Sequence, residues 1–293
     1  MTPAGRHVPV LSREVLALLA PASGEVWVDA TVGAGGHSRL IAERIAPNGL
    51  LIGLDQDPTM LALARPSLEG LPATLLHANF DQLLSALQQV GVQQVDGVLA
   101  DLGVSSDQLD TPERGLSFQR DGPLDMRLDP TQGEPASALL KRLSERELAE
   151  IFWKYGEERH GRRIAKRIVE TRRQTPIETT AQLAELVRRC VPREKGNRID
   201  PATRAFQGLR IAVNDELGSL ERLLSQLPNA VRPGGRVGVI SFHSLEDRLV
   251  KHAFRDGDVW EVLTKKPVQA DDAEVRDNPR ARSAKLRVAR RRN

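Results

Sequence analysis

The spacing of hydrophobic residues along the first third of the chain alternates between two patterns. Short apolar runs typical of buried strands are separated by segments whose apolar residues recur at helical spacing. The predicted strands cover 26–30, 50–55, 73–77 and 95–102, and the predicted helices cover 38–45, 59–67 and 80–90. This order is typical of a parallel sheet with helices packed on it.

The middle of the chain, from about 110 to 212, carries only helical spacing, which predicts an inserted all-helical subdomain. Capping residues indicate three helix starts: Ser144 with Glu147, Thr179 with Gln182, and Asp200 with Pro201. We expect the helix that starts at Asp200 to run without a break to about Leu227.

The strand pattern returns near the C-terminus. Pro233-Gly234-Gly235 predicts a turn before a strand at 236–242 and a helix at 244–254. The predicted fold is therefore α/β, a doubly wound, mostly parallel, Rossmann-like sheet with a helical insertion. The expected division is 1–109 and 213–293 for the sheet domain, and 110–212 for the insertion.

Composition limits the environment in which this chain works. With 40% hydrophobic residues it can bury a core, and its single cysteine, Cys190, can form neither an internal disulfide nor a zinc cluster. Residues 1–10 lack the features of an export signal, and no apolar run is long enough to span a bilayer. We expect a cytoplasmic protein with no membrane association and no metal.

Positive charge is concentrated in two places, although the formal net charge is only +3. Arginines cluster at 159–173 and in the C-terminal tail, 276–292, where few acidic residues accompany them. One interpretation is a solvated helix face and a frayed tail. The other is a polyanionic partner, which two separate basic clusters favour.

A glycine-rich segment follows the first predicted strand. Gly33, Gly35 and Gly36 lie between that strand and a helix, an arrangement in which backbone N–H groups can approach a nucleotide-like ligand. A plain tight turn is the alternative. Asp55 ends the second strand, where its carboxylate can accept hydrogen bonds from ribose hydroxyls. This acidic position is compatible with both nicotinamide and S-adenosylmethionine cofactors.

Three residues at successive strand ends favour S-adenosylmethionine. Asp29 precedes the glycine loop, where a carboxylate could orient an amino-acid tail but would repel a pyrophosphate. Phe80 follows the third strand and could pack on adenine. Asp101 ends the fourth strand, where a methyl group would be transferred. Individually, Asp29 and Asp101 could be caps and Phe80 could be core, but their joint occurrence points to one site.

Longer motifs occur over nearly the whole length of the chain. They are His7-Val8-Pro9-Val10-Leu11, Gly33-Ala34-Gly35-Gly36-His37-Ser38, Asp101-Leu102-Gly103-Val104-Ser105-Ser106, Arg114-Gly115-Leu116-Ser117-Phe118, Asp121-Gly122-Pro123-Leu124-Asp125-Met126-Arg127, Tyr155-Gly156-Glu157-Glu158, Ser241-Phe242-His243-Ser244-Leu245-Glu246-Asp247-Arg248 and Asn278-Pro279-Arg280-Ala281-Arg282-Ser283. Together they make the chain resemble the bacterial ribosomal RNA small subunit methyltransferase H family. The resemblance implies methylation of the exocyclic N4 of one cytidine in the decoding region of 16S rRNA, with S-adenosylmethionine as cofactor.

The resemblance also implies which residues contact the cofactor: Gly35, Gly36, His37, Asp55, Phe80, Asp101 and Gln108. Asp29 and Gly33 are added from the chemistry of the loop. Other amino methyltransferases end their fourth strand in Asp/Asn-Pro-Pro-aromatic, whereas this chain has Asp101-Leu102-Gly103-Val104. The aromatic residue that would stack on a flipped base is therefore missing, which leaves Phe118 and Tyr155 as candidates.

Asp101, or a backbone carbonyl beside it, is the expected acceptor for the N4 proton. The expected partner is 16S rRNA within the small ribosomal subunit, and the protein is expected to be a monomer or homodimer. Six arginines of the insertion are predicted to bind this RNA: Arg127, Arg162, Arg163, Arg167, Arg172 and Arg173. Only 3% of residues are aromatic, so extensive base stacking is not expected to be the main mode of recognition. His243 is expected to have a structural hydrogen-bonding role.

Two other functions fit parts of the sequence. An NAD-dependent oxidoreductase would share the glycine loop and Asp55 but lacks a recognisable hydride-transfer constellation. A non-catalytic RNA-binding ribosome assembly protein would account for the basic clusters but not for the acidic strand ends.

Overall fold

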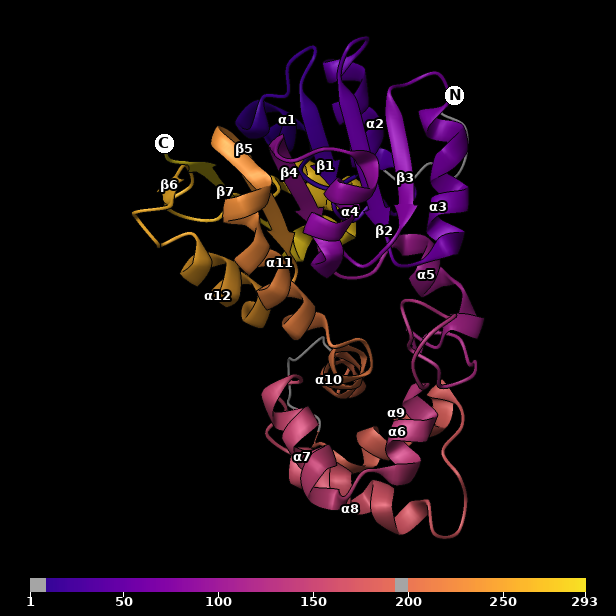
Figure 1. Ribbon diagram of the computed structural model, residues 1–293. Helices are drawn as coiled ribbons and strands as arrows, with labels where there is room; N and C mark the ends of the chain where they lie inside the picture. Colours follow the sequence, from indigo (N-terminus) through magenta and orange to yellow (C-terminus); the bar gives the residue numbers. More distant parts are fainter. Residues whose placement is uncertain (1–8, 193–199) are drawn as a thin grey trace. The chain divides into compact units, whose positions relative to one another are not determined.

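The computed structural model describes residues 9–192 and 200–293. Residues 1–8, with His7 and Val8 of the first family motif and most of the segment considered for export, lie outside this description. The chain divides into two compact units, one formed by Met1–Gly103 with Leu217–Asn293 and the other by Val104–Glu216 (Figure 1). The second unit contains the predicted insertion, 110–212, and extends it at both ends. None of the described helices has the length and hydropathy needed to cross a membrane.

The first unit is built on a seven-stranded sheet in the order β3-β2-β1-β4-β5-β7-β6. Its strands are β1 (Val26–Asp29), β2 (Leu50–Asp55), β3 (Ala73–His77), β4 (Val95–Asp101), β5 (Val231–Ser241), β6 (Trp260–Val262) and β7 (Lys285–Arg291). The first five strands pair in parallel, and β7 pairs antiparallel with both β5 and β6. The predicted doubly wound, mostly parallel fold is confirmed.

Helices cover both faces of this sheet (Figure 1). They are α1 (Ser12–Leu19), α2 (Gly36–Ile45), α3 (Pro58–Ala64), α4 (Leu83–Val90), α11 (Glu216–Ala230), α12 (Ser244–Ala253) and α13 (Asp272–Asp277), with short 3₁₀ turns η1 (Arg65–Leu68), η2 (Phe80–Gln82) and η4 (Pro279–Ser283). Successive strand residues point to opposite faces, so Trp27 packs in the core with α1, α2 and α3, whereas Val28 packs with α4, α11 and α12. Gly97, opposite Trp27 on β4, leaves room for the indole, because a Cβ there would lie 2.3 Å from the ring.

The second unit is helical. It contains α5 (Ser106–Asp110), η3 (Pro112–Arg114), α6 (Ala136–Arg142), α7 (Glu145–Lys154), α8 (Gly161–Thr171), α9 (Thr180–Cys190) and α10 (Ala202–Asn214) around a core of its own. Both predicted capping boxes are present: the side chains of Ser144 and Thr179 accept hydrogen bonds from the backbone N–H groups of Glu147 and Gln182. Asp200 also accepts from the Ala202 N–H, at 2.8 Å, as expected for a helix start.

The prediction of one continuous helix from Asp200 to Leu227 is wrong. The helix ends at Asn214, Asp215 adopts a left-handed conformation (φ +48°), and α11 starts at the next residue. The Asp215 N–H still donates to the carbonyl of Ile211, which is a common way to end a helix. Hydrophobic periodicity continues through the break and therefore cannot reveal it.

The predicted turn at Pro233-Gly234-Gly235 is also wrong, because these residues lie inside β5. The pairing of β5 with β4 shifts register here: Val231 pairs with Val95, and the next paired residue on β5 is Arg236, opposite Gly97. The extra residues form an irregularity of the strand, and Gly234 takes a positive φ (+82°) that glycine tolerates at little cost.

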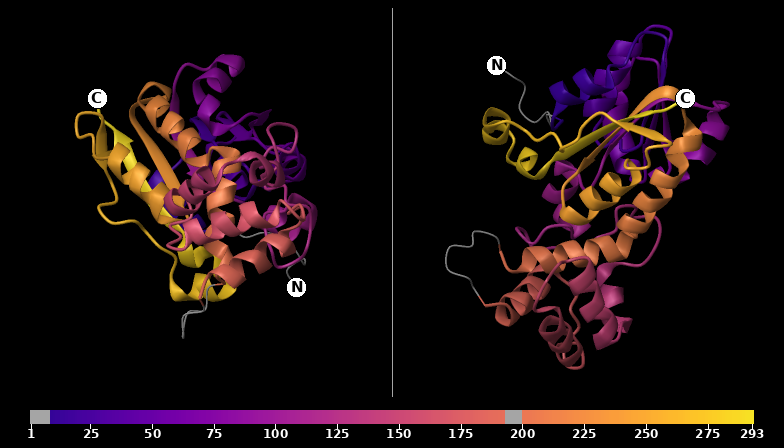
Figure 2. Two further views of the ribbon diagram at one scale, coloured as in Figure 1. Left: turned by 90° about the horizontal axis from the view of Figure 1, so that it is seen from below. Right: turned by 90° about the vertical axis from the view of Figure 1, so that its left-hand side faces the viewer.

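The basic C-terminal segment is not the free tail that was expected. Residues 285–291 form β7, which lies between β5 and β6 (Figure 2). Arg287 forms a 2.6 Å ion pair with Asp247, and Arg290 forms one of 2.6 Å with Glu261. These carboxylates come from other parts of the sequence. The composition of the C-terminal segment alone therefore suggested that its arginines lack acidic partners, whereas the fold supplies them.

Candidate active site

Three carboxylates lie at the carboxyl edge of the central sheet. Asp55 ends β2, Asp29 ends β1 and Asp101 ends β4, and these strands are neighbours in the order β2-β1-β4. The carboxyl ends of parallel strands form the usual ligand-binding edge of an open α/β sheet. The structure therefore brings together the three acidic residues that the sequence placed at successive strand ends.

The glycine loop between β1 and α2 is fastened to all three of these strands. The Gly33 N–H donates to Asp55 at 2.7 Å, and the Thr31 N–H donates to Asp29 at 3.1 Å. The backbone N–H of Asp101 donates to the hydroxyl of Thr31 at 2.6 Å. Thr31 was not among the predicted site residues, although a hydroxyl residue two positions before Gly33 is a signal for it.

Gly35 is required by both the conformation and the packing of this loop. It is the N-cap of α2 with a φ of +87°, and a Cβ there would lie 2.5 Å from the Ser67 hydroxyl. Gly33 also has a positive φ, +53°, but a Cβ there would meet no atom within 4 Å. The two glycines therefore serve different purposes: Gly35 permits close contact with η1, whereas Gly33 only provides conformational freedom.

Asp29 is fully buried and holds the loop against the helix that follows it. Its second carboxylate oxygen accepts a 2.6 Å hydrogen bond from the hydroxyl of Ser38, another residue that the sequence analysis did not single out. Burial raises the pKa of Asp29 to about 6, against the opposing effect of these hydrogen bonds. The structure thus gives Asp29 a role in shaping the loop.

Asp55 binds the loop with one oxygen and the Asp57 N–H, at 2.8 Å, with the other. Burial raises its pKa to about 6, and the neighbouring carboxylates of Asp57 and Asp29 add to the shift. Each of its oxygens accepts one of these protein hydrogen bonds and can accept a further one. Asp55 therefore has capacity for ligand hydroxyls at this edge.

Asp101 differs from the other two carboxylates because its oxygens have few hydrogen-bond partners. One oxygen lies 3.7 Å from Nε2 of His37, and the other, although buried, has no hydrogen-bond partner in the described part of the chain. Burial raises the pKa of Asp101 well above its usual range, with further contributions from Asp29 and Glu246. A buried acceptor without a partner is unusual in a folded protein and points to a function. The proximity of His37 to Asp101 was not predicted.

The remaining predicted cofactor residues occupy less decisive positions. Phe80 begins η2 and is half-buried against the hydrophobic core of the first unit. Gln108 belongs to the second unit, where it forms a capping box with Ser105 and is itself buried. A contact of either residue with a cofactor stays a prediction.

The two candidates for holding the target base lie in the second unit. The ring of Phe118 already makes an edge-to-face contact with Phe206, at 4.8 Å between centroids, and the guanidinium of Arg188 lies 5.5 Å from its centre. Tyr155 follows α7, and its carbonyl accepts a hydrogen bond from Gln207. The internal contacts of Phe118 make it the weaker candidate for base stacking.

The six arginines expected to bind RNA fall into three groups. Arg127 forms a bidentate ion pair with Asp125, and Arg172 donates to the carbonyls of Leu140 and Leu143, so both hold the second unit together. Arg167 lies 3.5 Å from Glu170 on the surface of α8. The exposed side chains of Arg162, Arg163 and Arg173 have no ion pair with a described carboxylate.

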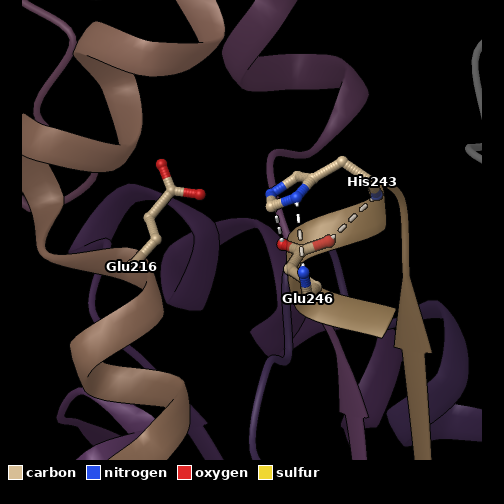
Figure 3. A group of neighbouring side chains, drawn as sticks. All are labelled: Glu216, His243 and Glu246. Carbon is tan, nitrogen blue, oxygen red and sulfur yellow. Dashed lines mark hydrogen bonds and ion pairs between the residues drawn. The ribbon is translucent and has the colours of Figure 1, made fainter. Parts of the chain in front are cut away.

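His243 has the structural role that was expected. It caps the N-terminus of α12: its Nδ1 accepts from the Glu246 N–H at 3.4 Å, and its Nε2 lies 3.2 Å from the Glu246 carboxylate (Figure 3). The other oxygen of Glu246 accepts from the backbone N–H groups of Phe242 and His243. The ring and the carboxylate thus close the turn between β5 and α12.

The fold and this edge define an α/β enzyme whose site suits a nucleoside-bearing cofactor. Residues 4–292 match the model of the MraW methylase family, so the chain belongs to that family and is a methyltransferase. This membership confirms the resemblance predicted from the motifs. It also decides against the NAD-dependent oxidoreductase and the non-catalytic assembly protein.

Curated relatives resemble the chain over nearly its full length. A protein of Sorangium cellulosum named ribosomal RNA small subunit methyltransferase H is 54% identical over 288 residues, which is 98% of this chain and 91% of that protein. A protein of the same name from Trichormus variabilis is 53% identical and covers 97% of this chain and 91% of its own length. Among solved structures, an rRNA methylase of Streptococcus thermophilus aligns over 99% of this chain and 100% of its own, with a TM-score of 0.47 and 9% identity. That last likeness is too loose to bear on function.

Proposed function

We propose that this enzyme transfers the methyl group of S-adenosylmethionine to the exocyclic N4 of a cytidine in the decoding region of 16S rRNA, within the small ribosomal subunit. The name shared by the full-length relatives supports the substrate class. The observation that carries the chemistry is the unpartnered, buried oxygen of Asp101 at the end of β4. In the cell, this reaction belongs in the cytoplasm, where ribosomal subunits are assembled.

The residues at the sheet edge fit the proposed cofactor. Asp55 offers acceptor capacity for ribose hydroxyls, the glycine loop presents backbone next to it, and Phe80 offers an aromatic face for adenine. When bound there, S-adenosylmethionine supplies a methyl group on a positively charged sulfur, which an amine can displace. Asp29 contributes by holding the loop in shape, with Gly35 and Gly36 forming the start of the helix that follows.

Asp101 is the residue that we assign to the target amine. The lone pair of N4 is delocalised into the cytosine ring, so an acceptor that binds an N4–H favours the nucleophilic form of the amine. The free oxygen of Asp101 can accept that hydrogen bond. After attack the amine is a strong acid, and its proton can pass to the carboxylate, whose raised pKa makes it a better acceptor.

The second unit is proposed to recognise the RNA. The target base must leave its stack to reach a carboxylate at the end of a strand. Exposed arginines of the second unit without a carboxylate partner, such as Arg162 and Arg163, are suited to phosphate contacts. Folded RNA in a subunit suits a protein with few aromatic residues better than extended single strands do.

The test is methyl transfer from labelled S-adenosylmethionine to purified small subunits that lack the modification, followed by digestion to nucleosides. The native chain should place label on N4 of cytidine. Asp101→Asn should lose most of this activity, because an asparagine side chain retains the size but not the acceptor strength of the carboxylate. Calorimetry with the cofactor measures separately the cofactor contact that the family resemblance implies for Asp101. Asp258→Asn, which changes an exposed carboxylate of the same unit, is the matched control. Label on protein, or on another base, would falsify the proposal.

A further inference from the structure

One of the three tryptophans of this chain is on the surface. Trp153, in the last turn of α7, is 64% exposed, whereas Trp27 and Trp260 are 1% and 4% exposed. It is also the most exposed of the large hydrophobic side chains in the described part of the chain. The core of the second unit does not need this indole, because Phe152 and Leu148 form the buried face of α7.

Trp153 lies next to the start of α8. The two helices pack closely at Gly161, where a Cβ would lie 3.0 Å from the Cβ of Phe152 and 3.4 Å from the backbone nitrogen of Trp153. Arg162 follows Gly161 directly, and Lys166 lies one turn further along α8; both side chains are exposed. The backbone of Trp153 and the first turn of a basic helix are thus neighbours.

The surrounding segment is strongly positive. Between Trp153 and Arg173 the chain has eight lysines and arginines against three glutamates, a surplus larger than the net charge of +3 of the entire chain. Arg172 is committed to backbone carbonyls, and Arg167 lies beside Glu170. In contrast, Arg162, Arg163 and Lys166 form no ion pair with any described carboxylate.

We propose that Trp153, Arg162 and Lys166, here called the α7–α8 patch, form an RNA contact site in which the indole stacks on an unpaired base and the two cations contact phosphates. This rests on the proposed function and specifies where the second unit holds its substrate. An exposed aromatic face beside unpaired cations is the combination that single-stranded nucleic acid requires, since every base has a face to stack. Bases within a duplex already stack on their neighbours, so the patch is suited to a loop or bulge of folded RNA.

Tryptophan fluorescence tests this without any methyl transfer. The probe is a single-stranded RNA of mixed sequence, about 12 nucleotides long to match the site sizes of single-strand binders, titrated into the full chain at low salt. Stacking should quench the emission of Trp153, protect it from iodide, and leave the two buried tryptophans unaffected. Trp153→Phe should lose the quenching but keep most of the affinity, because phenylalanine still stacks.

Two further variants separate stacking from general apolar contact. Trp153→Leu should weaken RNA binding at least about fivefold, since stacking contributes about 1–3 kcal/mol per base. Arg162→Ala with Lys166→Ala should lower the slope of log affinity against log salt by about 0.7 for each phosphate that is no longer neutralised. Arg189→Ala, which removes an exposed arginine of α9 already paired with Glu185, should change neither quantity.

The outcomes distinguish this inference from the proposed function. If the native chain methylates subunits but single-stranded RNA neither quenches nor protects Trp153, the α7–α8 patch is not an RNA site and the proposed function stands. If Trp153→Leu binds RNA as tightly as the native chain, the stacking role is likewise overturned. If the Trp153→Leu or Arg162→Ala/Lys166→Ala variants bind subunits more weakly but bind protein-free RNA as tightly as the native chain, the partner of the patch is a protein and the inference is refuted. Quenching without methyl transfer would support the patch and contradict the proposed function.

Discussion

Asp29→Asn should make the first unit more stable at neutral pH and remove part of its pH dependence. Asp29 is fully buried with a pKa of about 6, compared with 3.8 for the ordinary group. Above pH 6 the folded protein holds a buried charge at a cost, whereas below 3.8 the group is neutral in both the folded and unfolded chain. Asparagine can still accept from the Thr31 N–H and can donate to the Ser38 hydroxyl, so the loop keeps its hydrogen bonds.

The size of the effect follows from the pKa shift. At about 1.36 kcal/mol per pKa unit, a rise from 3.8 to about 6 corresponds to a loss of at most about 3 kcal/mol in the free energy of unfolding. The sign is fixed: a raised carboxyl pKa means that the folded state binds more protons, so stability falls as pH increases from about 4 to 6. Relative to the variant, the native chain should therefore lose up to about 3 kcal/mol over this range.

The assay is urea unfolding between about pH 4.5 and 7.5, a range that spans most of this titration. Tryptophan fluorescence, measured in a Trp153→Phe background, monitors the unfolding. In that background only Trp27 and Trp260 emit, and both are buried in the first unit. Asp258→Asn, which removes an exposed carboxylate, should show no pH-dependent difference from the native chain. The reasoning would be refuted if the difference in the free energy of unfolding between the native chain and Asp29→Asn did not change with pH. It would also be refuted if the native chain became the more stable of the two as pH increased.

Three other perturbations follow from the site and the sheet. Gly35→Ala should lower the affinity for S-adenosylmethionine more than about tenfold in calorimetry, because it adds a Cβ 2.5 Å from a side-chain oxygen to the left-handed strain that both glycine positions carry. Gly33→Ala, whose Cβ meets nothing within 4 Å, should lower the same affinity less, and equal effects would contradict this. Arg287→Ala leaves a partly buried carboxylate without its partner and should lower the free energy of unfolding by about 3 kcal/mol. Arg290→Ala should lower it by less than about 1 kcal/mol, because the Arg290 side chain is 43% exposed. Urea unfolding measures both variants, and a larger loss for Arg290→Ala would contradict this prediction. Affinity for S-adenosylmethionine should fall as pH drops below about 6, because Asp55 becomes protonated, and a pH-independent affinity would argue against ribose binding by this carboxylate.

Much of the fold could be predicted from local patterns. Strands β1 to β4 and the helices between them follow from apolar spacing, and the starts of α7 and α9 follow from capping residues, because both signals act over only a few residues. The acidic strand ends Asp29, Asp55 and Asp101 could be assigned to one site because parallel strands place their carboxyl ends at one edge.

Other features depend on contacts between distant parts of the chain and could not be predicted. The C-terminal arginines looked like a tail because their partners, Asp247 and Glu261, lie outside that segment, and only the pairing of β7 with β5 and β6 brings them together. The break at Asp215 occurs within an uninterrupted apolar pattern and is visible only in the backbone conformation.

The sequence by itself determined the class of fold, the position of the glycine loop and the residues that ring the site, since residue type and spacing are enough for each. Only the tertiary structure decided how those residues are used. Burial and hydrogen bonding are properties of the packed chain, and they commit Asp29 to the loop, leave one oxygen of Asp101 without a partner among the described residues, and place Trp153 on the surface although tryptophan is usually buried.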